Sequence, residues 1–529
     1  MRKMKKILAL LLTIVMTTSL VACGGDKGES KEPAPEVDVT DKVESNLELD
    51  ENATYKKEVV IAYEQKHSTM DPQQVANGIQ DTLYNMVFNQ LVVFNGETKE
   101  IEPELAESWE MLEDGKVWSF KLREDITFSN GEPLTADDVL FTYERAVATG
   151  VSTSAFTAVV ESVAIDGDYI VNYTLKSPNM DFLYEMAKGC NAILNRDACE
   201  ADPDKGHEIG TGGWTVEDWT ASEYADFVRW DNSWVWADGL TPTEKVSFKI
   251  MSEASARGVA VQTGEVDLAF RPNLNEMAEF AQDENVDYFV MSSESIDYLS
   301  LNFNNEMLKD GNLRKAIAYA IDVQGIIDIA CEGYGTPCTS LWGPNQYGFY
   351  DEFEEPWGYN LEKAKEYMAK SNYPNGCDLE ITSVASYAMF VEVLQAQLSA
   401  IGINVKVNIT DSPGLADMVT NNKIEALVYN KTCGPEGDNM RNVLVDGQGG
   451  NRVRYANPRI EELLNLALGE TDEAARLGYY QEIQEIVRED CYYIPLGYPV
   501  THALYNSKLS GVIWNANQKH DYTHVVCAE

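Results

Sequence analysis

Two periods of apolar residues recur along the chain and predict alternating strands and helices. Residues 118–122 alternate apolar and polar side chains, which is the period of a strand with one buried face. Behind this strand, Thr135 is placed to cap a helix, with Asp138 near the positive helix end. Apolar residues then follow at helical spacing from 139 to 147.

The same periods continue through the second half of the chain. They predict strands at 299–303, 403–407 and 493–496, and helices at 313–329, 390–401, 459–468 and 472–487. Because strands and helices alternate throughout, we expect an α/β protein built on packed sheets.

The amino-terminal pattern predicts export. Basic residues at positions 2, 3, 5 and 6 precede an apolar run over 7–16. That run is shorter than the ~20 residues that span a bilayer, but it suits a secretion signal. The following segment 20–24, Leu-Val-Ala-Cys-Gly, resembles the lipobox of bacterial lipoproteins. The resemblance implies a signal peptide over 1–22 and a lipid on Cys23; the alternative is an ordinary signal peptide with a chance cysteine.

Residues 23–54 are predicted to form a disordered tether. Positions 24–54 hold ten acids, three lysines and no aromatic residue. So little apolar surface does not offset the entropy of ordering the chain. A flexible segment of this length reaches ~30 Å, enough to hold a folded body near a membrane.

The net charge of the chain limits the classes of molecule that it is expected to bind. The formal charge is −45, and removal of the leader's four positive charges makes it −49. Such an acidic surface argues against nucleic acid and anionic lipid, and it favours neutral or cationic ligands. The alternative is that the acidic excess only keeps the protein soluble.

Cysteines and histidines leave several alternatives open. The eight cysteines after Cys23 include no Cys-x-x-Cys pair. Cys331 with Cys338, and Cys190 with Cys199, are candidate disulfides, and unpaired buried thiols are the alternative. Two histidines four residues apart, at positions 520 and 524, would share a face only if their segment were helical. No metal site and no cofactor are predicted.

Motifs of known catalytic sites are absent from the sequence. It contains no Gly-x-Ser-x-Gly elbow, no His-Glu-x-x-His motif and no phosphate-binding glycine loop. We therefore expect a protein that is not an enzyme.

Seven strings in order resemble one family. They are PELAESWEMLEDGKVWSFKLREDITFSNGEPLTADDVLFTYERA (103–146), IGTGGW (209–214), QTGEVDLA (262–269), LSLNFNNEMLKDGNLRKAIAYAID (299–322), YNLEKAKEYM and YPNG (359–376), and YYIPL (492–496). On these motifs the chain resembles the oligopeptide, dipeptide and nickel class of ABC-transporter solute-binding proteins.

This resemblance implies a two-lobed α/β fold of the periplasmic-binding-protein type. Lobe one would comprise 55–298 with a subdomain inserted over about 82–200, lobe two would comprise 299–497, and 498–529 would return to lobe one. The hinge strands would cross near 298–302 and 495–499. Ligand would bind between the lobes and close them. The expected partners are ABC permease subunits, and the expected state is a monomer anchored by lipid to the cell membrane, on its extracellular face or its periplasmic side.

Peptide is the leading ligand, since an extended peptide can pair its backbone with strand edges. By the resemblance, the cleft would be lined by Ser68, Thr69 and Met70 in lobe one, and by Tyr429, Asn430, Lys431 and Thr432 in lobe two. Trp214, Trp342 and Tyr347 are candidates for an aromatic wall, and packing in the cores is their alternative role.

One position departs from the family pattern. Many peptide-binding relatives carry an aspartate that pairs with the ligand's ammonium, and Thr432 stands there, beside Lys431. Either Glu436 or Asp438 substitutes, or the ligand lacks a free amino terminus at that place. A nickel chelate or an oligosaccharide is the alternative ligand, and a surface hydrolase or a ligand sensor is the alternative function.

Overall fold

The structure is a computed structural model of the 529-residue chain. It describes residues 49, 53–74, 78–96, 98–149, 156–237, 239–353, 358–515, 517 and 519–529. The predicted signal peptide, Cys23 and nearly all of the predicted tether lie outside the described residues. Among the described helices, none has both the length and the apolar composition needed to cross a bilayer.

A seven-stranded mixed sheet forms the core of the first lobe. Its strands, in spatial order, are β12 (Val286–Ser292), β18 (Val500–Asn506), β11 (Leu268–Phe270), β1 (Glu58–Tyr63), β10 (Lys245–Ile250), β9 (Tyr224–Arg229) and β8 (Trp214–Thr220). The central strand β1 runs parallel to both of its neighbours. Helices α2 (Gly78–Val87), α7 (Ala254–Gln262) and α8 (Leu274–Phe280) belong to the same region. Because β18 comes from the carboxyl-terminal part, the chain returns to this sheet after building the second lobe.

A four-stranded antiparallel sheet is inserted between β1 and β8 in sequence. Its strands are β4 (Ala106–Leu112), β5 (Val117–Leu122), β7 (Ile170–Leu175) and β6 (Val160–Asp166). The helices of this region are α3 (Ala136–Thr149), α4 (Phe156–Val159), α5 (Phe182–Met186) and α6 (Arg196–Ala201), and β2 (Val92–Asn95) pairs with β3 (Glu100–Pro103). The predicted strand 118–122 and the helix after Thr135 are confirmed. The Asp138 carboxylate accepts hydrogen bonds from the Thr135 amide at 3.0 Å and hydroxyl at 3.1 Å, which holds the helix start.

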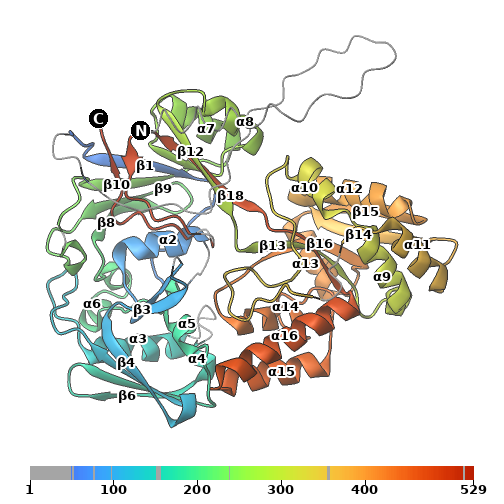
Figure 1. Cartoon of the computed structure of the whole chain (residues 1–529). Coiled ribbons are helices and arrows are strands. Elements are labelled where there is room, and N and C mark those ends of the chain that lie inside the picture. Colours follow the sequence, from blue (N-terminus) through green and yellow to red (C-terminus); the bar gives the residue numbers. More distant parts are fainter. Residues whose placement is uncertain are drawn as a thin grey trace. The chain divides into compact units, whose positions relative to one another are not determined.

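The second lobe is built on a five-stranded sheet. Its strands, in order, are β15 (Ile403–Thr410), β14 (Cys377–Val384), β16 (Ala426–Thr432), β13 (Ser295–Leu301) and β17 (Tyr493–Gly497). Its helices are α9 (Gly311–Ala320), α10 (Val323–Ala330), α11 (Leu361–Lys370), α12 (Ala388–Ser399), α13 (Ser412–Thr420), α14 (Arg441–Leu444), α15 (Pro458–Gly469) and α16 (Glu473–Asp490). Helix α12 packs on β14 and β15, and α9 packs on α11 (Figure 1). The helices predicted at 390–401, 459–468 and 472–487 are confirmed.

The single helix predicted over 313–329 is wrong. The structure has α9 and α10 instead, separated at Ile321 and Asp322. The Asp322 side chain accepts a hydrogen bond from the Gly325 amide at 3.2 Å, so it caps a new helix. The Asp322 amide donates to the Gln397 side chain at 3.0 Å. Both apolar patterns share one period, and therefore periodicity alone did not reveal the break.

Two short crossings join the lobes. The chain passes from β12 to β13 through Ser293 and Glu294, and from β17 to β18 through Tyr498 and Pro499. The Ser293 amide donates to the Pro499 carbonyl at 2.8 Å, so the crossings are hydrogen-bonded to each other. The second crossing lies in the predicted range. The first lies before the predicted 298–302, because β13 begins at Ser295.

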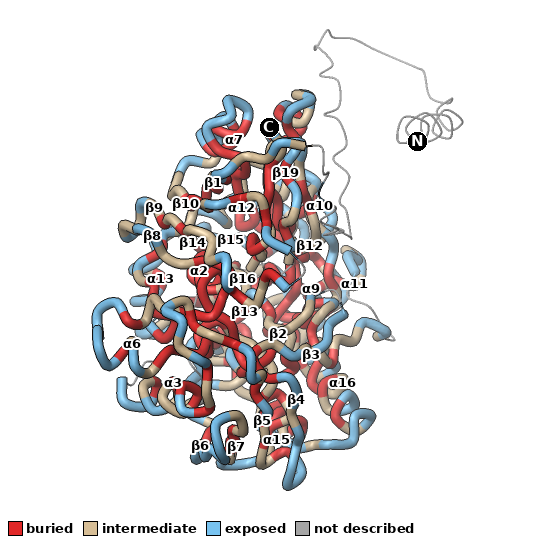
Figure 2. Tube along the Cα trace, turned by 90° about the vertical axis from the view of Figure 1, so that its left-hand side faces the viewer, coloured by how far each residue is buried: buried red, intermediate tan, exposed pale blue. Residues whose placement is uncertain are grey.

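Burial follows the sheets. All seven residues of β13 are buried, whereas half of the residues of α6 are exposed (Figure 2). The glycine turn before β8 packs closely on the end of α2: a Cβ at Gly212 would lie 2.6 Å from the Met86 carbonyl oxygen. Only glycine allows this approach, and the turn leads directly into Trp214. A last pair of short strands, β19 (Leu509–Ser510) and β20 (Val526–Cys527), lies near the carboxyl end.

The eight described cysteines are all free, and six of them are buried. Of the two alternatives that the sequence left open, the structure therefore has unpaired thiols. Neither Cys331 with Cys338 nor Cys190 with Cys199 forms a disulfide.

Candidate ligand-binding cleft

A cleft of about 1990 Å³ opens among the described residues. Lobe one contributes segments between Gln65 and Trp236 and the stretch around Trp514 to His524, and lobe two contributes Asn345, Asn439 and 432–436. Glu294, in the first crossing between the lobes, also lines it. The cleft therefore has walls from both lobes and from the crossing that joins them.

Two of the predicted ligand-binding residues line this cleft, namely Thr432 and Glu436. The Thr432 and Ser295 hydroxyls lie 3.1 Å apart at the ends of adjacent strands. Asp438 does not line the cleft. Its two carboxylate oxygens accept hydrogen bonds from the Arg441 Nε at 3.0 and 2.8 Å, so this acid already has a cation.

Asn430 and Lys431 line a separate pocket of about 280 Å³, together with Arg452 and Thr432. The Arg452 guanidinium lies 4.1 Å from the centre of the Tyr429 ring. Burial lowers the pKa of Lys431, and the positive charges of Lys188 and Arg452 also lower it, although nearby acids oppose this effect. The described residues that line this pocket include two basic residues, Lys431 and Arg452, and no acid.

The three predicted aromatic residues pack inside the lobes. Trp214 is 1% exposed and donates its Nε1 hydrogen bond to the Thr523 carbonyl at 3.1 Å. Trp342 is fully buried in the core of lobe two, and Tyr347 packs against that core with Arg476 4.2 Å from its ring centre. None of the three lines the cleft. Other aromatic residues line it, and these were missed: Phe88, Phe94, Tyr184, Trp234, Trp236 and Trp514.

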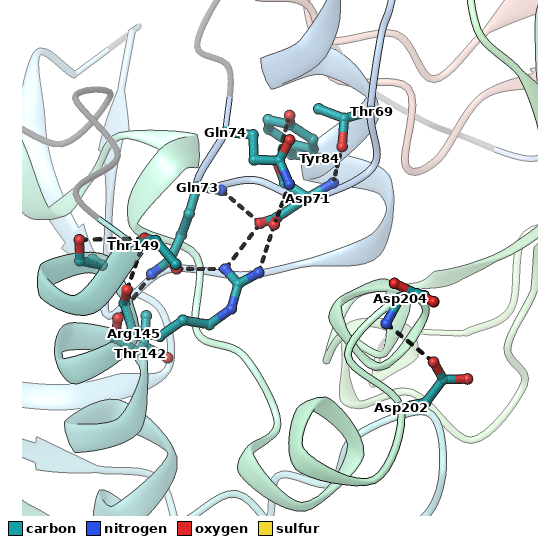
Figure 3. Close-up of polar contacts among 11 residues, drawn as sticks. Thr69, Asp71, Gln73, Gln74, Tyr84, Thr142, Arg145, Thr149, Asp202 and Asp204 are labelled. Carbon is teal, nitrogen blue, oxygen red and sulfur yellow. Dashed lines mark hydrogen bonds and ion pairs between the residues drawn. The ribbon is translucent and has the colours of Figure 1, made fainter.

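The predicted segment 68–70 is held by lobe one itself. The Ser68 amide donates to the Gln80 side chain at 2.7 Å, and the Gln80 amide donates to the Thr69 carbonyl at 2.6 Å. Met70 is buried in the core. The segment continues into Asp71, which Arg145 holds from α3 (Figure 3). Residues 68–70 do not line the cleft.

Charged groups form a network at the cleft, and of these the sequence analysis had named only Glu436. The Lys188 ammonium lies 2.6 Å from the Glu185 carboxylate and 3.2 Å from that of Glu436. Burial alone would raise the pKa of Glu436, but Lys188 lowers it below its ordinary value. A second pair joins Lys519 to Asp81 at 2.5 Å. Lys188 and Glu436 are far apart in the chain, as are Lys519 and Asp81, so the sequence did not indicate that these residues pair.

Glu294 differs from these acids because none of the described residues forms an ion pair with it. Its side chain is buried, with 6% of the residue exposed. Asn345 donates a long hydrogen bond to Oε1 at 3.4 Å, and Oε2 has no hydrogen-bond partner among the described residues. Burial, and after it the charge of Glu436, raise the pKa of the Glu294 carboxyl to about 7. The one sequence signal that could have pointed to Glu294 as a cleft residue is its position directly before β13, near the predicted hinge.

The two histidines near the carboxyl end make separate contacts within lobe one. His520 is buried and its Nδ1 accepts the Asn515 amide at 3.0 Å, and burial lowers its pKa to about 3. His524 packs edge-on against Trp236, with ring centres 5.3 Å apart. In the described part of the chain, no group of three or more His, Cys, Asp or Glu residues is arranged to hold a metal ion.

Comparisons with known proteins point to one family. Residues 100–451 match the model of the bacterial extracellular solute-binding proteins, family 5. The chain is 25% identical to heme-binding protein A of Haemophilus influenzae over 477 residues, which covers 82% of this chain and 86% of that protein. It is also 25% identical to the glutathione-binding protein GsiB of Escherichia coli over 475 residues, covering 86% and 91%.

A solved structure agrees. The periplasmic binding protein DppA of Helicobacter pylori, in complex with the peptide STSA, matches with a TM-score of 0.73 and 26% identity. The match covers 90% of this chain and 99% of that one.

Proposed function

The chain belongs to the bacterial extracellular solute-binding proteins of family 5, and from this premise we propose that it captures peptides for an ABC importer. Proteins of this family bind small ligands or peptides and work with ABC permease components. The choice of peptide as the ligand goes beyond the family assignment. It is supported by the peptide bound to the DppA relative and by the name of the glutathione-binding relative.

The observation that carries the proposal is the size and lining of the cleft. Its volume of about 1990 Å³ exceeds the 300–1,000 Å³ typical of sites for drug-sized ligands. A peptide of several residues, together with ordered waters, fits such a space. Thr432, the last residue of β16, lines the cleft, so the end of a strand is available to pair with an extended ligand backbone.

The proposal predicts binding without turnover. Alanine peptides of two to six residues, titrated into the purified protein, are expected to bind and to raise the melting temperature by about 3 °C or more near saturation, because ligand stabilises only the folded state. Mass spectrometry should recover the peptides unchanged. Parallel titrations with a nickel–histidine chelate, heme and a linear glucan serve as comparisons. If one of these binds and no peptide does, the peptide assignment is wrong; cleaved peptide would instead indicate an enzyme.

We also propose that the protein is anchored to the outer face of the cell membrane through a lipid on Cys23. The sequence before Cys23 supports this, although the residue lies outside the described part of the structure. Replacing Cys23 with alanine is expected to move the protein from the membrane fraction to the medium. Cys527→Ala is a matched control that should leave the fractionation unchanged. Retention of the Cys23→Ala protein on the membrane would contradict the anchor.

A further inference from the structure

We propose that Glu294 is the anchor for a positively charged amine of the ligand, so that this protein selects ligands with a free ammonium group. The inference rests on the proposed function and adds to it a ligand chemistry and a residue that recognises it. The ammonium group can come from a peptide's amino terminus or from a lysine side chain.

The backbone holds Glu294 at the junction of the two lobes. Its carbonyl accepts a hydrogen bond from the Cys433 amide at 3.0 Å, which joins the crossing to the segment of lobe two that lines the cleft. Glu294 directly precedes Ser295, whose hydroxyl meets that of Thr432. Glu294 is thus fixed between the walls of the cleft before any ligand arrives.

The described residues do not satisfy all of the hydrogen-bonding capacity of the Glu294 carboxylate. It is buried, and its Oε2 has no hydrogen-bond partner within the described residues. An unpaired buried carboxylate is costly, and it persists where something else supplies the missing charge. Glu294 is among the residues that line the cleft, so a ligand bound there lies next to it.

The neighbouring charges do not supply the missing cation. The pKa of Glu294 is raised by the negative charge of Glu436, and it is lowered by the positive charges of Lys519 and Lys99. Lys519 is paired with Asp81 at 2.5 Å, and no ion pair joins either lysine to Glu294 among the described residues. Glu436 and Glu185 share Lys188. Of these acids, Glu294 is therefore the one whose charge is still unmatched.

An ammonium group satisfies this site better than a neutral donor does. It donates up to three hydrogen bonds and carries the opposite charge, so its bond to a carboxylate is shorter and stronger than a neutral one. Thr432 adds a hydroxyl acceptor close by, at the end of β16.

Selection by amine is tested with tetra-alanine, its amino-acetylated form and an acetylated tetrapeptide that contains one lysine. Calorimetry on the wild type is expected to show at least about tenfold tighter binding of free tetra-alanine than of the acetylated form. The lysine peptide distinguishes the two sources of the amine: if it binds as tightly as free tetra-alanine, a side-chain amine is accepted. Glu294→Gln should abolish the preference while still accepting the bond from Asn345.

Proton release gives a second readout. With a pKa of about 7, Glu294 is protonated in about half of the molecules at pH 7, and an arriving ammonium expels that proton. Titrations in buffers of different ionisation enthalpy should thus show release of about half a proton per free peptide bound. Glu294→Gln should remove this release.

Asp297→Asn is the matched control. Asp297 is also a buried acid in the same strand region with a raised pKa, but it does not line the cleft. It should leave the preference and the proton release unchanged. If Glu294→Gln weakens free and acetylated peptides equally, or changes neither, the role of Glu294 is refuted while peptide binding stands. If no peptide binds the wild type, the proposed function and this inference fail together.

Discussion

Replacing Arg145 with methionine is expected to cost about 3–5 kcal/mol of folding free energy, because it leaves Asp71 charged and buried without its cation. Asp71 is 1% exposed. Arg145 donates to both of its oxygens, at 3.1 and 2.6 Å, and to the Gln73 side chain at 2.6 Å (Figure 3). The pair thereby ties the segment after Met70 to helix α3. The measurement is the free energy of unfolding in urea, followed by circular dichroism.

Acid titration provides a second check on this pair. Burial alone would raise the pKa of Asp71, but the hydrogen bonds and the charge of Arg145 lower it below its ordinary value. A carboxyl with a lowered folded-state pKa stabilises the fold above its unfolded pKa of about 3.9, and this stabilisation is lost as the pH falls. The difference between wild type and Arg145→Met should therefore shrink below about pH 4.

Arg459→Met is the control for the loss of an arginine. Arg459 pairs with Glu482 at 2.8 Å, but both side chains are more than two-fifths exposed. Exposed pairs contribute about 0–1 kcal/mol. The double variant Asp71→Asn with Arg145→Met should regain part of the lost stability, because the buried charge is gone. A loss for Arg145→Met as small as that for Arg459→Met would show that the buried pair is not needed.

Replacing Asp297 with asparagine is expected to stabilise the protein at pH 8. Asp297 is 4% exposed in β13, and the Tyr387 hydroxyl donates to it at 3.0 Å. No cation pairs with it among the described residues. Burial raises the pKa of its carboxyl to about 7. The folded protein therefore holds a proton that the unfolded chain loses near pH 3.9.

The sign of the effect follows from linkage. The folded state binds more protons between about pH 4 and pH 7, so Asp297 makes stability fall as the pH rises through that range. Above pH 7 its contribution is constant, and it costs about 2–4 kcal/mol there. Asparagine retains the acceptor for Tyr387 and carries no charge. Thermal unfolding at pH 4, 6 and 8 should show near-equal stability at pH 4 and a growing advantage for the variant.

Asp378→Asn is the contrasting control. Asp378 is an exposed acid whose pKa is lowered by its hydrogen bond from Lys406 and by Asn404. Its loss should not stabilise the protein at high pH. If Asp297→Asn is less stable than wild type at pH 8, the carboxylate makes a favourable interaction that outweighs its burial.

Thr432 stands where many relatives have an aspartate, and the structure shows the surroundings of the acids nearby. The sequence left two alternatives open: either Glu436 or Asp438 replaces the family's aspartate, or the ligand lacks a free amino terminus there. The structure pairs both with cations, Lys188 and Arg441 respectively. Whether either contacts ligand stays a prediction, and Glu294 is the better candidate because, of these three acids, it is the one without an ion pair among the described residues.

Local physical chemistry explains why many elements could be predicted from the sequence. Strand β5 and helix α3 are recognised because burial of one face imposes a period of about 2 or 3.6 residues, and Thr135 with Asp138 marks a helix start within four positions. The two-lobed α/β class follows from the ordered family strings. Each of these signals lies within a short stretch of chain.

Only the tertiary structure decided which side chains meet in the cleft. The sequence shows that all four of these residues are large and aromatic. It does not show that the cores enclose Trp214 and Trp342, whereas Trp234 and Trp514 line the cleft. Lys188 and Glu436 are 248 positions apart, and their pairing depends on how two lobes are placed. Charge pairing and burial of a carboxylate are set by distant neighbours in space, and for this reason Glu294 became distinct only in the folded protein.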